Sequence, residues 1–141
     1  MSKRGRRIAF DYGDVRTGVA LCDPDGILAS PLCVLETKSK SFTSEIAALL
    51  TEHEPIAIYV GMPVNMSGST GESAEKVDSF VATLKELSDL PIHLIDERLS
   101  TVSAQKKLKE AGVSSRDSKQ LIDAMAAVAI LEQGLLSENL A

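Results

Sequence analysis

The sequence predicts an α/β fold built on a five-stranded mixed sheet with helices on both faces. Three strand-like runs follow one another near the amino terminus with short connections, which favours an antiparallel meander. Two later apolar runs each follow a segment of helical periodicity, which favours two further strands parallel to the first. At 141 residues the chain has the usual size of one domain, and we expect residues 1–141 to form a single domain.

The first three predicted strands cover residues 7–12, 17–22 and 27–35. In the first of them Ile8, Phe10 and Tyr12 alternate onto one face. The four residues 23–26 are typical of a turn, and they join the second strand to the third. Pro31 interrupts the third run, so we expect that strand at an edge of the sheet or with a bulge.

The rest of the chain alternates between helix and strand. The spacing of Phe42, Ile46 and Leu49 predicts a helix over 41–53 that Ser41 is able to cap. The continuous apolar run 56–60 is typical of a strand covered on both faces. After it we expect a loop over 61–72, a helix carrying Ala74, Val77, Val81 and Leu84 on one face, a strand over 92–95, a helix from Ser100 to Gly112, and a final helix over about 117–136.

Composition places the chain among soluble globular proteins. Hydrophobic residues make up 44% and charged residues 25%. The longest apolar run, 124–131, is far shorter than the ~20 residues that cross a bilayer, and Asp11 ends the first apolar stretch too early for a signal peptide. Cys22 and Cys33 are not expected to face each other, so we expect free thiols in a reducing compartment. We therefore expect a cytoplasmic protein with no membrane partner.

The net charge of −5 argues against a protein that coats nucleic acid nonspecifically. Basic residues are nevertheless clustered, first at Lys3, Arg4, Arg6 and Arg7 and again late in the chain. Such clusters are able to bind phosphates, and the alternative is that both are ordinary solvated faces. The candidate substrate-binding residues of the late cluster are Lys106, Lys107, Lys109, Arg116 and Lys119.

Three carboxylates interrupt patterns that are otherwise apolar. Asp123 is the single polar residue between positions 121 and 131, and a buried carboxylate is costly unless it is paired or binds a metal. Asp11 interrupts the first strand, and Glu97 closely follows the strand over 92–95, where open α/β sheets place their ligands. The structural alternatives are a core aspartate bonded to a hydroxyl or a backbone amide for Asp123, and a plain turn for Asp11.

Convergence of these carboxylates would require a cation, because three anions cannot otherwise approach closely. Mg²⁺ suits such a site, and two ions would activate water and stabilise the leaving oxygen at phosphorus. Asp11, Glu97 and Asp123 are therefore the candidate catalytic residues and metal ligands. Since uncompensated anions repel one another, we expect Asp123→Asn to abolish cleavage without destabilising the metal-free protein.

Other residues are candidates to bind phosphates. The segment 61–71 is rich in Gly, Ser and Asn, and its backbone amides are able to reach phosphates, although a plain connection would look the same. Arg16 and Arg98 are suited to clamp a phosphate, or else to pair with Asp14 and Asp96. The candidates within the segment are Gly61, Asn65, Gly68 and Gly71.

Six motifs occur in order along the chain: IAFDYG at 8–13, RTGVA at 16–20, VGMP at 60–63, GSTGESA at 68–74, DERLST at 96–101 and IDAMAAV at 122–128. With these motifs the sequence resembles the YqgF (RuvX) family, which is described both as pre-16S rRNA nucleases and as Holliday-junction-resolvase-like proteins of the ribonuclease-H fold. The resemblance covers nearly the whole chain.

The resemblance implies a single ribonuclease-H-like nuclease domain whose catalytic acids fall on Asp11, Glu97 and Asp123. It implies a metal-dependent endonuclease that uses Mg²⁺ or Mn²⁺, with Arg98 steadying a phosphate oxygen. The implied partner is structured RNA, at the 5′ end of pre-16S rRNA in ribosome biogenesis.

Three alternatives stay open beside that function. Resolution of branched DNA needs two active sites and therefore a homodimer, whereas RNA processing allows a monomer. A catalytically silent nucleic-acid-binding module is expected to lack one of the acids, and none is missing here. An ATPase of the actin and sugar-kinase type shares the motif of Asp11 and Gly13 but needs two such domains.

Overall fold

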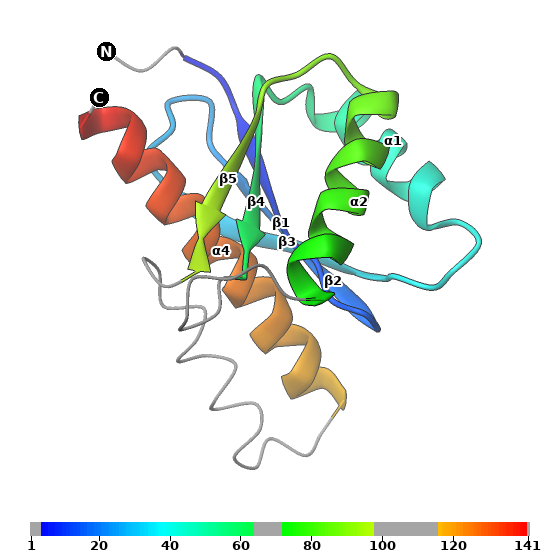
Figure 1. The fold of residues 1–141 in the computed structure, drawn as a ribbon. Helices are drawn as coiled ribbons and strands as arrows, with labels where there is room; N and C mark the ends of the chain where they lie inside the picture. The colour runs from blue at the N-terminus through cyan, green and yellow to red at the C-terminus, as the bar shows by residue number, and fades with distance from the viewer. Residues whose placement is uncertain (1–3, 64–71, 98–115, 141) are drawn as a thin grey trace.

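A computed structural model describes residues 4–63, 72–97 and 116–140 of the chain (Figure 1). The elements are, in order, β1 (Arg7–Asp11), β2 (Arg16–Cys22), β3 (Ala29–Glu36), α1 (Phe42–His53), β4 (Ala57–Met62), α2 (Glu72–Leu87), β5 (Ile92–Asp96) and α4 (Arg116–Leu140). The helix expected between Ser100 and Gly112 lies outside the described residues. Within them, no helix combines the length and the hydropathy needed to cross a membrane.

The five strands form one mixed sheet in the order β3-β2-β1-β4-β5, which confirms the predicted fold class. β2 is antiparallel to β1 and to β3, while β4 is parallel to β1 and to β5. β3 lies at one edge, and the register shifts between Val19, which pairs with Cys33, and Ala20, which pairs with Pro31. The expected edge position and the expected bulge therefore both occur at Pro31, where the proline nitrogen cannot donate to the sheet.

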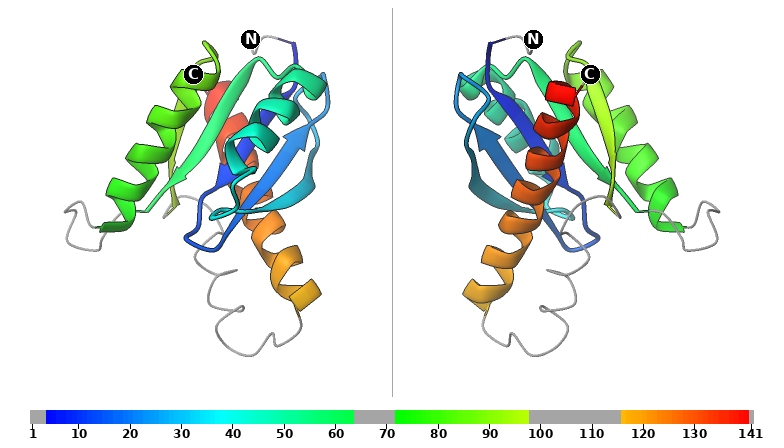
Figure 2. Two further views of the ribbon diagram at one scale, coloured as in Figure 1. Left: turned by 90° about the vertical axis from the view of Figure 1, so that its right-hand side faces the viewer. Right: turned by 90° about the vertical axis from the view of Figure 1, so that its left-hand side faces the viewer.

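Helices cover the two faces of the sheet, with α4 on one side and α1 and α2 on the other (Figures 1 and 2). Alternation along β1 divides its side chains between the two faces. Ile8 and Phe10 belong to the core under α1 and α2, whereas Ala9 belongs to the core under α4. We call these the α1/α2 face and the α4 face.

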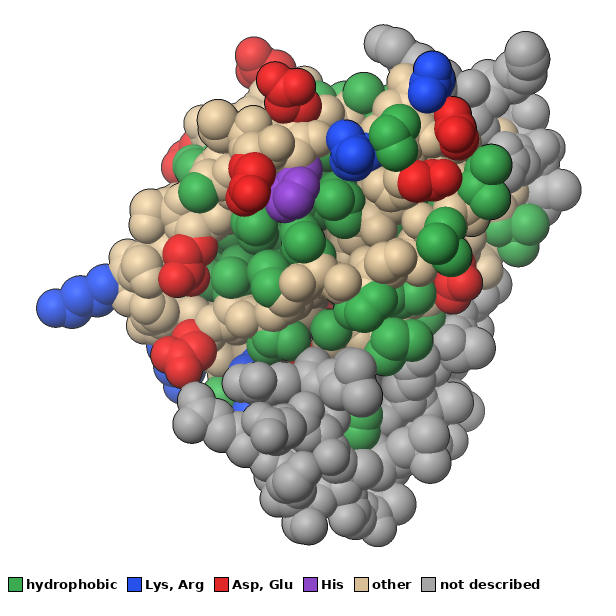
Figure 3. All heavy atoms as spheres, turned by 180° about the vertical axis from the view of Figure 1, so that it is seen from behind, with side chains coloured by type: hydrophobic (Ala, Val, Ile, Leu, Met, Phe, Trp, Pro, Cys, Tyr) green, Lys and Arg blue, Asp and Glu red, His purple; other side chains and the backbone are tan. Residues whose placement is uncertain are grey.

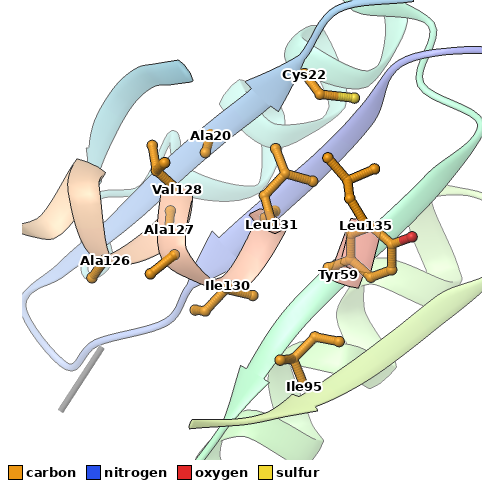
Figure 4. Close-up of a cluster of buried hydrophobic side chains, with 12 residues drawn as sticks. Ala20, Cys22, Tyr59, Ile95, Ala126, Ala127, Val128, Ile130, Leu131 and Leu135 are labelled. Carbon is orange, nitrogen blue, oxygen red and sulfur yellow. The ribbon is translucent and has the colours of Figure 1, made fainter. Parts of the chain in front are cut away.

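The core of the α4 face is built from small and branched side chains. Alanines of α4, among them Ala126 and Ala127, lie on the sheet, and Ile130 and Leu131 fill the space towards Tyr59 (Figure 4). All five of these side chains are almost completely buried. The small residues allow the helix to approach the strands closely, which brings polar groups of α4 within reach of the ends of the strands.

Two local details differ from the expectations. Ser41 precedes α1, but its side chain makes no capping hydrogen bond, because its backbone is not extended (φ −92°, ψ 3°) and its hydroxyl lies 2.9 Å from that of Ser39. β3 begins at Ala29 rather than at residue 27, because Asp23 Oδ1 accepts hydrogen bonds from the amides of Ile27 and Leu28.

One further boundary differs, and the others agree closely with the predicted ones. Gly61 and Met62 belong to β4 and not to the loop that was expected from residue 61. Cys22 and Cys33 pair in the sheet with Ala29 and Val19, and both are free thiols as predicted.

Candidate active site

Asp11 is the last residue of β1, at the carboxyl end of the central strand. By alternation it shares the α4 face with Ala9. Its register partner on β2 is Gly18. On the other side Phe10 pairs with Val60, so Gly61 of β4 follows beside Asp11. A glycine therefore flanks Asp11 on each neighbouring strand.

Gly18 allows α4 to lie directly on β2. A Cβ atom at Gly18 would overlap the carbonyl oxygen of Asp123 and would lie 3.2 Å from the amide nitrogen of Ala124. No residue other than glycine fits under the helix here without moving it. The close approach of α4 to the sheet thus falls at the register partner of Asp11, and it brings Asp123 to the carboxyl end of β1.

Gly61 makes room for Ile130 of α4 and lies close to the third acid. A Cβ atom at Gly61 would lie 2.5 Å from Ile130 Cδ1 and 3.3 Å from Glu97 Oε1. Glu97 follows β5 directly, and its side chain reaches back over β4. Asp11, Glu97 and Asp123 are exposed by 5%, 9% and 8%, so burial of all three agrees with the interruptions seen in the sequence.

Arg16 holds Asp123. Its Nε donates to Asp123 Oδ2 at 2.6 Å, a short charge-assisted contact. The alternative partner, Asp14, instead binds Lys76 of α2 at 3.1 Å. Arg16 therefore compensates the charge of Asp123, a partner that the expected repulsion among uncompensated carboxylates left out. Arg16 is thus a charged partner of Asp123 that the sequence-based interpretation did not include.

The donor chemistry at this end fits Mg²⁺ or Mn²⁺, because the three buried carboxylates supply the oxygen ligands that these ions prefer. Across residues 4–63, 72–97 and 116–140, however, no three His, Cys, Asp or Glu side chains are already grouped as a metal site. Binding of a cation by all three acids would require Asp123 to exchange the guanidinium of Arg16 for the cation.

A hollow of about 200 Å³ opens beside Glu97. Lys76 was not predicted, although its place in the first turns of a helix after a glycine-rich segment is a signal that could have indicated it. The hollow is lined by Tyr12, Gly13, Asp14, Pro63, Lys76, Val77 and Glu97.

The other predicted substrate-binding residues lie at the start of α4 or outside the described part of the chain. Arg116 and Lys119 fall in the first turns of α4, and their side chains are not described. Those outside the described residues are Asn65, Gly68, Gly71, Arg98, Lys106, Lys107 and Lys109.

The basic cluster at the amino terminus is not one solvated patch. Arg4 pairs with Asp25 at the surface, whereas Arg7 is 1% exposed on the α4 face. Arg7 Nη1 donates to the carbonyl oxygen of Gly5 at 2.6 Å, and Nη2 donates to Glu138 Oε1 at 3.3 Å. The guanidinium of Arg7 therefore makes its interactions inside the protein and is not available to bind a phosphate.

Arg7, Glu138 and Tyr59 form a second buried cluster on the α4 face. The hydroxyl of Tyr59 donates to Glu138 Oε2. Burial raises the pKa of Tyr59 well above its ordinary value, and the hydrogen bond and the negative charge of Glu138 raise it further. Sequence patterns missed this cluster because its members lie on three separate elements.

The side of the molecule seen in Figure 3 carries a group of hydrophobic side chains in its middle. Asp and Glu side chains are spread around this group, with Lys and Arg side chains among them. Its hydrophobic centre and mixed charges are poorly suited to bind a polyanion.

Solved structures define the class of the fold. The Thermus thermophilus RuvC bound to a Holliday junction superposes with a TM-score of 0.60 at 14% identity, covering 95% of this chain and 96% of that one. The fowlpox virus resolvase, also solved with Holliday junction DNA, gives 0.53 at 12% identity and covers 94% and 98%. At these identities the likeness shows the fold alone, which is the ribonuclease-H-like fold of the resolvases.

Sequence comparisons define the family. Residues 5–137 match the family model described as "RuvX: Holliday junction resolvase". Proteins named "Putative pre-16S rRNA nuclease" are 43% identical in Streptomyces coelicolor and 42% identical in Streptomyces avermitilis, covering 97% of this chain and 83% and 89% of the relatives. The chain belongs to the RuvX family, which confirms the resemblance.

Proposed function

We propose that this protein is a metal-dependent endonuclease that hydrolyses phosphodiester bonds in structured nucleic acid, and that it acts in the cytoplasm on the 5′ end of pre-16S rRNA during ribosome biogenesis. The observation that carries the proposal is the pair of glycines that flank Asp11. Gly18 accommodates the backbone of Asp123, and Gly61 accommodates Ile130 of α4 and lies beside the carboxylate of Glu97. Acids from three distant segments are thus supported beside one strand end, within what we take to be one domain.

The three acids would hold the metal, which when bound supplies Lewis acidity and an activated water at phosphorus. Asp11 and Glu97 approach from the carboxyl ends of β1 and β5, and burial keeps bulk water away from them. Arg16 holds Asp123 in place before the metal binds. Once released, its guanidinium can donate to a phosphate oxygen instead, a role that the family resemblance also implies for Arg98.

RNA is the favoured substrate because relatives that are 42–43% identical over almost the whole chain carry the name of a pre-16S rRNA nuclease. A four-way DNA junction is the second candidate, supported by the family description and by the likeness to a RuvC solved with that substrate. Junction resolution would need a homodimer with two active sites, whereas an RNA end can be processed by a monomer.

The test compares the wild-type protein with Asp11→Asn on a pre-16S 5′ leader RNA and on a four-way DNA junction, in chelator and in Mn²⁺. Loss of a partner that only supports a metal ligand costs about 10–100-fold, so loss of a ligand should slow cleavage at least about 100-fold. Asp11 is chosen because its replacement leaves the Arg16–Asp123 pair in place. Asp89→Asn, an exposed acid before β5, is the matched control and should cleave normally.

Each outcome has a definite meaning. Metal-dependent cleavage of the RNA that Asp11→Asn abolishes supports the proposal. Preference for the junction favours the resolvase instead. Binding of both substrates without cleavage favours the catalytically silent module, and cleavage by Asp11→Asn at the wild-type rate contradicts the assignment of the acids.

A further inference from the structure

An ion pair lies at the hollow beside Glu97 and has no part in the proposed metal site. Lys76 Nζ lies 3.1 Å from Asp14 Oδ1 and 3.2 Å from Oδ2. The two side chains are 41% and 58% exposed. A pair this exposed adds little to stability, because water and salt screen it. It can therefore exchange partners at little cost.

The core fixes the position of both partners. Val77, next to Lys76 on α2, is buried on the α1/α2 face. Tyr12, two residues before Asp14, stacks on Phe80 of the same helix with ring centroids 4.8 Å apart. The carboxylate and the ammonium group are thus presented by two elements that are packed against each other, and only the side-chain tips are free to move.

The size of the hollow indicates what kind of ligand fits. Pockets that enclose whole small molecules measure roughly 300–1,000 Å³, and this one measures about 200 Å³. It therefore suits one unit of a chain whose remainder lies outside. Because Glu97 and Lys76 line the same hollow, a unit seated there lies beside a candidate catalytic acid and a cation at once.

We propose that Lys76 binds a phosphate oxygen of the nucleic-acid strand at this hollow, and that Asp14 occupies Lys76 whenever no strand is bound. The inference rests on the proposed function, because it seats the strand that is to be cut beside Glu97. A phosphate offers Lys76 the same negative charge and acceptor oxygens as the carboxylate of Asp14. Asp14 is then a built-in competitor that lowers affinity for the strand.

The test measures binding of fluorescein-labelled pre-16S leader RNA and of a labelled four-way junction by anisotropy, in chelator so that no cleavage occurs. Lys76→Ala should weaken binding severalfold and reduce the slope of log affinity against log salt by ~0.7 on single strands, the value for one lost phosphate contact. Lys76→Arg should retain binding. Asp14→Asn should strengthen binding, and this gain should vanish in Asp14→Asn/Lys76→Ala.

Lys85→Ala removes the same charge from an exposed position near the other end of α2 and should leave affinity and slope unchanged. Melting temperatures of all variants should stay close to that of the wild type, since the pair is exposed. The inference is overturned if Lys76→Ala binds like the wild type, if Lys76→Ala and Asp14→Asn both weaken binding, or if the gain from Asp14→Asn persists without Lys76.

The two proposals fail separately in this design. A wild-type protein that binds through Lys76 but never cleaves in Mn²⁺ contradicts the proposed function and leaves the binding role of Lys76 standing. Metal-dependent cleavage together with unchanged binding by Lys76→Ala contradicts only the role of Lys76. A wild-type protein that binds neither nucleic acid overturns both.

Discussion

α4 makes an arginine–carboxylate pair with the sheet at two places, through Glu138 near its carboxyl end and through Asp123 nearer its amino end, and the two pairs differ in how the charge is satisfied. At the Arg7 end, the arginine is 1% exposed and is bonded to a backbone carbonyl as well as to Glu138, which also accepts from Tyr59. At the Arg16 end, the arginine side chain is 26% exposed and holds Asp123. Asp11 and Glu97 are buried near this second pair.

The difference teaches what separates a structural ion pair from an exchangeable one. In the cluster of Arg7, Glu138 and Tyr59 the arginine has several acceptors, and removal of any partner leaves buried groups unsatisfied. At the Arg16–Asp123 pair the arginine side chain is partly exposed, so its carboxylate partner can be exchanged at lower cost. We therefore expect the Arg7 end to govern stability and the Arg16 end to govern metal binding.

The largest effect is expected from Arg7→Met. Removing one partner of a buried pair costs about 3–5 kcal/mol, and the partial exposure of Glu138 puts this case at about 3 kcal/mol. The melting temperature should fall by about 10 °C, while cleavage at temperatures below melting stays normal. Arg4→Met, which breaks the exposed pair with Asp25, is the matched control and should melt like the wild type. Equal melting temperatures of Arg7→Met and Arg4→Met would contradict a structural role for the cluster of Arg7, Glu138 and Tyr59.

A smaller effect is expected from Arg16→Met. Loss of Arg16 leaves the buried carboxylate of Asp123 without this guanidinium and should lower metal-free stability by about 2 kcal/mol. Asp123→Asn should also lower it, in place of the neutral effect first expected. Because Asp123 no longer has to exchange Arg16 for a cation, added Mg²⁺ should raise the melting temperature of Arg16→Met more than that of the wild type. Paired thermal melts in chelator and in excess Mg²⁺ measure both quantities. An equal or smaller Mg²⁺ effect in Arg16→Met would show that arginine and metal do not compete.

The smallest effect concerns alkaline pH. The pKa of Tyr59 is raised in the folded state, so above the ordinary tyrosine pKa of about 10 the unfolded chain loses this proton while the folded chain keeps it. The contribution to stability is complete below that pH and is lost as the pH rises through it, by about 0.4 kcal/mol at pH 10 and more above. Tyr59→Phe should show a shallower decline in urea unfolding between pH 8 and 10.5. Tyr12→Phe, which retains Tyr59, should decline as the wild type does, and a wild-type decline in Tyr59→Phe would contradict the assignment.

Local patterns were enough to predict the sheet, most element boundaries and the burial of three acids. Asp123 stood alone in an apolar run, and Asp11 broke an apolar strand, so the apolar surroundings of each indicated the burial that the structure shows. Alternation along β1 also indicates the side of the sheet on which Arg7 lies. Residues 7, 9 and 11 share one face, which indicates that Arg7 points towards α4 with Asp11.

The interaction partners of these charged residues could not be predicted from the sequence. Periodicity indicates which face of a helix or strand is buried, but it does not indicate which residue of another element contacts that face. Arg16 and Asp123 are 107 positions apart, Lys76 and Asp14 are 62 apart, and Arg7 and Glu138 are 131 apart. Asp14 is nearer to Arg16 in sequence, yet it forms its ion pair with Lys76, because α2 packs against the chain beside Tyr12. Only the packing of α2 and α4 on the sheet decides these pairs.

The seat of α4 on Gly18 also bears on the order in which the molecule is assembled. All five strands precede residue 97, and Asp123 is synthesised after them on the helix that rests against β2. During synthesis the sheet can form before its last acid exists, and docking of α4 then closes contacts across more than a hundred residues. A nascent chain therefore carries only two of the three acids, and it gains the third in one late step that the bare backbone of Gly18 permits.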